Sequence, residues 1–479
     1  MGRPGQTSAH RALLRPGETC WRLARAGRAA FLMDNEAFYA ALLEALQGAR
    51  RSILLLGWAF DPRTRLAPDG SEGPDDPDEI GRVLLDLTQS RPGLDVRLLI
   101  WKATLSATGI HPFLRHRAKT WFAGTAVKFL EADDVPFGAC HHQKVILIDD
   151  RLAFCGGGDI VTNRWDTPAH LQVDPRRILP QHRLHPPRHE VTMLVDGEAA
   201  AALGDLFRAR WRGAGQDEPA PGPVIEDRDP WPVSAPVSLR DVDVGVARTE
   251  PHWKARPLVD EIRQLTLACI AKATRTIYLE NQYFTSHIVA DALERRLAEP
   301  DGPEVILIIT RRSPSWFDQA TMDQGRNPIV RRLRAADRFG RFRALAPRTS
   351  GGQTILLHAK VSIFDDRVIR VGSANLNDRS GGFDTECELA VEGDDAALRA
   401  AIAGFRDRLL GHFLAVEPAA VAEAQGRHGS LAKAVDALNA DGRLTPIAVG
   451  KATWWETFVA AHHLGDPSDA SESWRPRGW

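Results

Sequence analysis

Apolar residues along the chain fall into two patterns. A helical period is found in two stretches, 35–49 (NEAFYAALLEALQGA) and 257–273 (PLVDEIRQLTLACIAKA). Each stretch leads into a short apolar run, at 49–60 (ARRSILLLGWAF) and 273–284 (ATRTIYLENQYF), which is typical of a buried strand. Helices that alternate with short apolar strands favour a layered α/β fold.

Two further apolar runs begin with an unusual polar pair. Residues 138–160 (GACHHQKVILIDDRLAFCGGGDI) place His142 two positions before Lys144. Side chains two apart on a strand point to the same face, so both groups share one face. Two groups that can be cationic are costly to bury together, and the pattern therefore indicates a bound anion or solvent at this position.

The second of these runs repeats the first. Residues 356–380 (LLHAKVSIFDDRVIRVGSANLNDRS) contain His358 and Lys360, and an alignment on the two histidines needs no gap. It places Asp149 on Asp365, Gly156 on Gly372 and Asp159 on Asn375, and upstream 49–60 corresponds to 273–284 and 94–101 to 303–310. A repeat of this extent indicates a duplicated domain. We expect two α/β/α sandwich halves in one chain, with pseudo-twofold symmetry and an active site at their interface.

Composition places the expected boundaries. A chain of 479 residues with 43% hydrophobic content is large enough for two or three domains. Residues 213–236 (GAGQDEPAPGPVIEDRDPWPVSAP) are rich in Pro, Gly and acidic residues and lack a helical or strand period, which predicts a linker. The expected parts are an N-terminal extension (1–30), the first half (31–212), the linker (213–244), the second half (245–415) and a C-terminal helical appendage (416–479).

Charge and cysteine content exclude several classes of protein. The 61 basic and 62 acidic residues give a net charge of −1, which disfavours bulk binding of nucleic acid. The five cysteines show no C-x2-C spacing, so neither a disulfide framework nor a metal site is expected, and we expect no cofactor. Without a signal-like apolar segment or a run of about 20 apolar residues, a cytoplasmic protein is expected. The oligomeric state stays open.

The motifs resemble those of the phospholipase D superfamily. The likeness rests on both His-x-Lys-x4-Asp motifs, on RWD (164–166), YLENQYF (278–284) and GSANLNDRS (372–380), and it covers about residues 30–415. The segments GGGDI and GSANLNDRS are more similar to phosphatidylcholine-cleaving members than to cardiolipin synthases or small nucleases. The two copies differ after the shared glycine, because the first has Gly157 and Asp159 where the second has Ser373 and Asn375.

Paired histidines suit phosphodiester cleavage, which needs a nucleophile, a proton donor and positive charge around the phosphate. Imidazole titrates near neutrality, so one histidine can be neutral while the other is charged. Local spacing does not decide which one attacks. The resemblance implies that His142 forms a phosphohistidine and that His358 protonates the leaving group and then activates water or an alcohol. The expected phosphate-holding groups are Lys144, Lys360, Asn375, Asp159, Ser373 and Gly157.

Carboxylates are expected to orient the histidines, since a nucleophilic imidazole needs its far nitrogen fixed. The resemblance implies Glu190 and Glu388 for this role, and Glu386, on the same strand face as Glu388, is an open alternative. Asp149 and Asp365 each open an Asp-Asp-Arg turn, where aspartate commonly accepts hydrogen bonds from local backbone amides. For these two a structural role is the preferred interpretation.

The leading hypothesis is a phospholipase D that needs no metal. It would hydrolyse phosphatidylcholine or phosphatidylethanolamine at a membrane surface to phosphatidic acid, and transfer the phosphatidyl group to alcohols. The alternatives are a cardiolipin synthase-like phosphatidyltransferase, a nuclease, and an inactive lipid-binding module. Intact His/Lys pairs in both halves disfavour the last. Strong basicity would have favoured a nuclease, and paired transmembrane helices a cardiolipin synthase.

Overall fold

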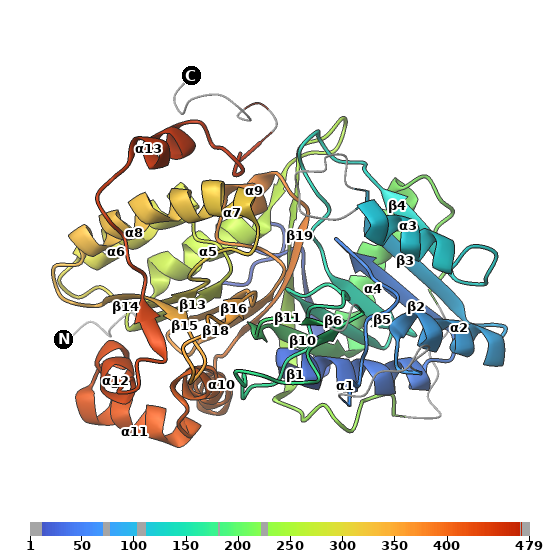
Figure 1. Ribbon diagram of the computed structural model, residues 1–479, viewed down its shortest axis with the longest axis horizontal. Coiled ribbons are helices and arrows are strands. Elements are labelled where there is room, and N and C mark those ends of the chain that lie inside the picture. The colour runs from blue at the N-terminus through green and yellow to red at the C-terminus, as the bar shows by residue number, and fades with distance from the viewer. Residues whose placement is uncertain are drawn as a thin grey trace, which may run out of the picture.

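A continuous mixed sheet of 16 strands runs through the molecule (Figure 1). The computed structural model describes residues 12–69, 77–102, 112–180, 183–221, 229–469 and 471. From the centre outward, the strand order is β1-β10-β6-β5-β2-β3-β4 on one side and β11-β19-β18-β17-β13-β14-β15 on the other. The two sides match strand for strand, and β1 pairs with β11 in antiparallel orientation. The duplication predicted from the repeat is therefore confirmed, with the pseudo-twofold axis between β1 and β11.

The strand bounds show the same correspondence. The first half contains β1 (Arg22–Met33), β2 (Ser52–Gly57), β3 (Asp95–Trp101), β4 (Lys128–Ala132), β5 (Val145–Ile148), β6 (Leu152–Gly156) and β10 (Val191–Asp196). The second half contains β11 (Leu239–Glu250), β13 (Thr276–Asn281), β14 (Glu304–Ile309), β15 (Phe342–Pro347), β17 (Val361–Phe364), β18 (Val368–Gly372) and β19 (Glu386–Glu392). In each of these seven-stranded sets, the three outer strands run parallel and the inner neighbours run antiparallel.

Helices cover both faces of the sheet, and their apolar residues pack with those of the strands in three large clusters. In the first half, α1 (Asp34–Gly48), α2 (Ile80–Ser90) and α3 (Pro112–Trp121) lie on one face and α4 (Gly197–Gly213) on the other. In the second half, α5 (Glu261–Lys272), α6 (His287–Ala298) and α8 (Gln324–Ala336) lie opposite α10 (Ala396–Leu414), α11 (Pro418–His428) and α12 (Leu431–Leu438) (Figure 1). Among the described residues, no helix is long and apolar enough to cross a membrane.

Short elements connect the layers. They are α7 (Trp316–Asp318), the π-helix η2 (Gln319–Asp323), α9 (Asp378–Gly382), α13 (Trp454–Ala461), β7 (Ile178–Leu179), β8 (Arg183–Leu184), β12 (Val259–Asp260) and β20 (Leu444–Pro446). One small pair matters for the site, because β9 (Arg188–His189) of the first half runs parallel to β16 (Leu356–Leu357) of the second.

Three segments expected to lie outside the halves contribute to the sheet. Strand β1 begins at Arg22, within the expected N-terminal extension, and β11 begins at Leu239, within the expected linker. In the expected C-terminal appendage, β20 pairs with β15 at the edge of the second half. The acidic, proline-rich composition of 213–236 obscured the strand that follows it. Part of that segment, 222–228, lies outside the described residues.

Candidate active site

His142 lies three residues before the start of β5 and is fixed by residues of the second half. Its backbone N–H donates to the carbonyl oxygen of Thr385 at 2.9 Å. Its ring Nδ1 lies 2.9 Å and 3.0 Å from the two carboxylate oxygens of Glu386. That buried carboxylate also accepts hydrogen bonds from the hydroxyls of Ser373 and Ser380. With Nδ1 engaged, Nε2 is the ring nitrogen left for chemistry.

His358 occupies the corresponding position before β17 and is fixed by the first half. Its backbone N–H donates to the carbonyl oxygen of His189 at 2.8 Å, which continues the β9–β16 pairing. Its Nδ1 lies 3.3 Å from Oε1 of Glu190, which is an ion-pair contact and not a hydrogen bond. Glu190 is held by three donors: Asn35 Nδ2 at 3.2 Å, Arg164 Nη1 at 3.0 Å and Arg188 Nε at 2.6 Å.

The two motifs form one composite site, because each histidine faces a carboxylate of the other half. Gly157 shows how closely the halves approach. A Cβ atom at Gly157 would lie 2.8 Å from the carbonyl oxygen of His358 and 2.9 Å from Cδ of Lys360. Only glycine therefore fits at this position without displacing the second motif.

The structure contradicts the expectation that Glu388 orients a histidine. Within the described part of the chain, Glu388 forms a buried ion pair with Arg370 and no hydrogen bond or ion pair with His142 or His358. The strand register explains the error: Gly156 pairs with Thr192, whereas its repeat partner Gly372 pairs with Glu388. Two residues before Thr192 lies Glu190, and two residues before Glu388 lies Glu386. Glu386 is thus the structural counterpart of Glu190.

The two lysines lie beneath the histidines and are almost fully buried. Lys144 Nζ donates to the carbonyl oxygen of His142, and Lys360 Nζ donates to that of His358, both at 2.8 Å. Their other partners differ. Lys144 lies 3.5 Å from a carboxylate oxygen of Asp159, whereas Lys360 donates to the amide oxygen of Gln282 at 3.2 Å.

Burial and mutual repulsion shape the titration of the site. Burial, and then the charges of Lys144 and Lys360, lower the pKa of His142 well below its usual value. Burial, Lys360 and Arg164 lower the pKa of His358 in the same way. Burial raises the pKa of Glu386 to about 8. A bound phosphodiester anion would offset the repulsion among these cations, so the site is suited to a single negative group.

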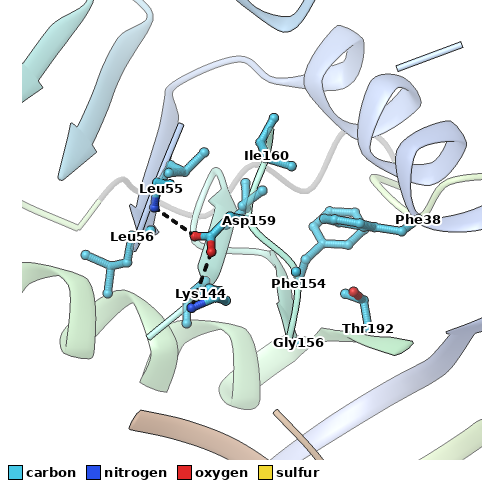
Figure 2. A pocket seen from close by; sticks show the side chains of 14 residues that line it. Phe38, Leu55, Leu56, Lys144, Phe154, Gly156, Asp159, Ile160 and Thr192 are labelled. Carbon is cyan, nitrogen blue, oxygen red and sulfur yellow. Dashed lines mark hydrogen bonds and ion pairs between the residues drawn. The ribbon is translucent and has the colours of Figure 1, made fainter. Parts of the chain in front are cut away.

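The expected phosphate-holding residues separate into two kinds. Asp159 accepts the backbone N–H groups of Trp58 and Ala59. Its carboxylate faces Lys144 and holds the lysine in place (Figure 2). Ser373 donates to Glu386 and accepts the N–H of Cys387. These two side chains are committed to protein partners. Asn375 is different, because its buried Oδ1 has no hydrogen-bond partner and its side chain lines a small pocket with Lys360.

Asp149 and Asp365 make matching contacts away from the histidines. Asp149 accepts the backbone N–H groups of Arg50, Arg51 and Ser52, and Asp365 accepts those of Thr274, Arg275 and Thr276. Both aspartates have positive φ angles, 57° and 54°, in the turn after the motif strand. Each ties its turn to the start of the neighbouring strand, which is a structural contact.

Two site residues were missed in the sequence, Trp58 and Gln282. The ring of Trp58 meets that of His142 edge-on, with centroids 6.4 Å apart, and Gln282 accepts from Lys360. The two residues are equivalent in the alignment of 49–60 with 273–284. That alignment was the available signal, because residues at the carboxyl ends of equivalent strands reach the same site.

The fold and the composite site define a class: duplicated α/β proteins in which two His/Lys motifs face each other across a pseudo-twofold axis. Sequence comparison gives the same result. The profile described as "Phospholipase D" matches residues 45–296, more than half of the chain. That described as "Cardiolipin synthase, PLD-like domain" matches residues 266–406. The chain belongs to the phospholipase D family.

Individual relatives are distant. Phospholipase D A of Dictyostelium discoideum is 26% identical over 75% of this chain and 32% of its own length. Phospholipase D alpha 4 of Arabidopsis thaliana is 24% identical over 73% of this chain and 59% of its own length. The matches thus span between a third and three fifths of these relatives. The crystal structure of a phosphatidylserine synthase from Haemophilus influenzae shares the fold, with a TM-score of 0.56, 16% identity, and coverage of 81% of this chain and 88% of that one.

Proposed function

We propose that the protein is a phospholipase D that cleaves the headgroup phosphodiester of phosphatidylcholine or phosphatidylethanolamine at a membrane surface. The observation that carries the proposal is the crossed pairing of His142 with Glu386 and His358 with Glu190. Two imidazoles oriented from opposite halves fit a two-step displacement at one phosphorus atom. The curated relatives, whose names identify them as phospholipases D, support the same activity.

In the first step, Nε2 of neutral His142 attacks phosphorus while the bond to the headgroup oxygen breaks. Protonated His358 gives its proton to that oxygen, so the headgroup leaves with a neutral hydroxyl group and not as an alkoxide. Glu386 stabilises the positive charge that develops on the His142 ring. In the second step, now-neutral His358 takes a proton from water, which displaces His142 and yields phosphatidic acid. An alcohol in place of water yields a phosphatidyl alcohol.

Lysine and amide groups hold the phosphoryl oxygens in this scheme. Burial and the charge of Lys144 lower the pKa of Lys360 well below its usual value, so Lys360 takes up its proton together with the phosphodiester anion. Lys144 and Lys360 then supply positive charge in a water-poor site, where such charge stabilises an oxyanion strongly. Asn375 can donate its side-chain N–H without adding charge. These groups are suited to one phosphodiester rather than to a long polyanion, in keeping with the net charge of −1. The five free, buried cysteines support a cytoplasmic location.

The test incubates the purified protein with vesicles of phosphatidylcholine, phosphatidylethanolamine or phosphatidylglycerol, and separately with single-stranded DNA, each with a little ethanol. A covalent phosphatidyl-enzyme predicts phosphatidylethanol beside phosphatidic acid, because ethanol competes with water for one intermediate. The His142→Ala variant, purified identically, controls for contaminating activity. Cleaved DNA with intact lipids would replace the proposal by a nuclease. Cardiolipin as the sole product from phosphatidylglycerol would replace it by a synthase.

A further inference from the structure

A second cluster of titratable side chains lies behind the active site, at the junction of the two halves. It comprises Asp34 at the start of α1, His170, His189 at the end of β9, and His412 in the last turn of α10. One ligand-type atom from each of the four lies within 4.8 Å of the others. Asp34, His170 and His189 are each at most 2% exposed. None of the four has a role in the proposed phosphoryl transfer.

Carboxylates outside the cluster fix two of the imidazole rings. Asp166 lies 2.9 Å from Nδ1 of His170, which leaves Nε2 of that ring to face the cluster. Glu280 lies 2.9 Å from Nε2 of His189, which leaves Nδ1 to face Asp34. Histidines that bind metals commonly donate their other ring N–H to a carboxylate in this way.

Several polar atoms inside the cluster lack hydrogen-bond partners. Oδ2 of Asp34 and Nε2 of His170 are buried and unpaired, and they face each other at 3.6 Å, too long for a hydrogen bond. Neither ring nitrogen of His412 makes a hydrogen bond of normal geometry, and both are buried. Unsatisfied buried polar atoms are costly, so four such atoms in one place point to a ligand between them.

Negative charge gathers around the cluster. Three buried carboxylates, those of Asp34, Asp166 and Glu280, converge on it. Arg177 lies 3.5 Å from Asp166. A divalent cation among these carboxylates would offset their mutual repulsion.

We propose that Asp34, His170, His189 and His412 bind one divalent transition-metal ion, with zinc as the best match. Three imidazole nitrogens and one carboxylate oxygen are a typical four-coordinate zinc set, whereas magnesium and calcium prefer oxygen ligands. Binding requires His189 to be neutral at Nδ1, so a proton leaves that nitrogen as the metal enters. The ligands come from distant segments, which is why motif spacing gave no sign of them.

The ion has a structural role in this proposal. Asp34 Oδ1 accepts the backbone N–H of Glu190 at 3.2 Å, and the backbone N–H of Asp34 donates to the carbonyl oxygen of Glu190 at 2.8 Å. The metal would thus join α1, β9 and α10 behind the carboxylate that orients His358. It would stabilise the junction of the halves without contacting the phosphodiester. This structural role of the ion is independent of the lipid substrate.

The test measures metal content and stability of the full chain, produced without a histidine tag. Elemental analysis should give about one zinc per chain, and the melting temperature should fall after dialysis against a strong chelator and return with Zn²⁺ but not with Mg²⁺. Replacement by Co²⁺ should produce a visible d–d absorption typical of a four-coordinate site. These measurements use the wild-type protein and need no enzymatic activity.

Matched variants locate the site. His412→Ala should lose most of the bound metal and the cobalt absorption, while His185→Gln, which alters another buried histidine outside the cluster, should retain both. If His412→Ala fails to fold, the cobalt spectrum of the wild-type protein decides whether a four-coordinate metal site is present. Two results would overturn the proposal. The first is wild-type protein that binds less than about a tenth of an equivalent of Zn²⁺ or Co²⁺ and keeps the same melting temperature after incubation with either metal. The second is a folded His412→Ala variant that retains all of the metal.

Discussion

The two halves carry the same His/Lys motif but surround the lysine differently. In the first half, the carboxylate of Asp159 lies 3.5 Å from Lys144 and is held by two backbone N–H groups. In the second half, the neutral amide of Gln282 accepts from Lys360, and the repeat partner of Asp159 is the neutral Asn375. The fold of the two halves is thus symmetric, whereas the charge next to the two lysines differs.

The surroundings of the two histidines differ as well. Asp159 raises the pKa of His142 against the effects of burial and the lysines, while burial, Lys360 and Arg164 act together to lower the pKa of His358. Glu386 contacts two serines and a histidine, whereas Glu190 accepts from two arginines and an asparagine. Duplication supplied two equivalent scaffolds, and the residues around each lysine and each carboxylate differ between them.

The largest expected effect comes from removing either histidine. His142→Ala and His358→Ala should each reduce release of the headgroup from phosphatidylcholine on the order of 10³-fold or more, because the two act as a unit. The double variant should be little worse than either single one. Choline release, with circular dichroism as the folding control, measures this. Near-normal turnover in one single variant would show that the motifs do not form one site.

The two glutamates of β19 provide a matched pair. Glu386→Gln should lower kcat by about 10²-fold, since the His142 ring loses the carboxylate that stabilises its charged form. Glu388→Gln should leave kcat within a few-fold but lower the melting temperature, because Arg370 would stay buried without its partner. The reverse result, with Glu388→Gln inactive and Glu386→Gln active, would restore the assignment made from the sequence.

Strand β19 shows how much of the site the sequence alone could predict. The histidines, the lysines and the duplication follow from local spacing and the internal repeat, and the structure brings the two motifs together. Glu386 and Glu388 share a strand face, so the alternation of side chains along β19 could not show which of them orients a histidine. The register of β19 with β18 shows that Glu386 is the counterpart of Glu190. The cluster of Asp34, His170, His189 and His412 joins four distant segments. Such contacts depend on tertiary packing and leave no local pattern.

The difference in charge beside the two lysines can be tested by removing the carboxylate at Asp159 and measuring how kcat/KM depends on pH. The acid limb of kcat/KM reports protonation of His142 in the free enzyme. Asp159 favours the charged imidazole and so raises its pKa. Asp159→Asn should therefore lower that pKa and move the acid limb to lower pH, by about half a unit to one unit. Gln282→Glu, which places a carboxylate beside Lys360, is the converse variant and should raise KM. An acid limb that moves to higher pH in Asp159→Asn would contradict the account.

The smallest effect on catalysis is expected at the paired turn aspartates. Asp149→Ala and Asp365→Ala should each destabilise the fold by about 1–3 kcal/mol, because each loses three backbone hydrogen bonds and places alanine at positive φ. Turnover by the folded fraction should stay within about twofold of wild type. Urea denaturation followed by fluorescence measures the stability. A 100-fold loss of kcat in fully folded Asp149→Ala would assign this residue to the chemistry instead.

The central claim is that His142 carries the phosphoryl group while His358 moves the protons. The most direct measurement uses His358→Ala with a phosphatidyl ester of p-nitrophenol, a leaving group that needs no proton donor. The account predicts one burst of p-nitrophenol per enzyme, and a phosphatidyl adduct on the peptide containing His142 when the reaction is quenched at alkaline pH and analysed by mass spectrometry. An adduct on His358 in the His142→Ala variant, or steady turnover by His358→Ala without any adduct, would contradict it.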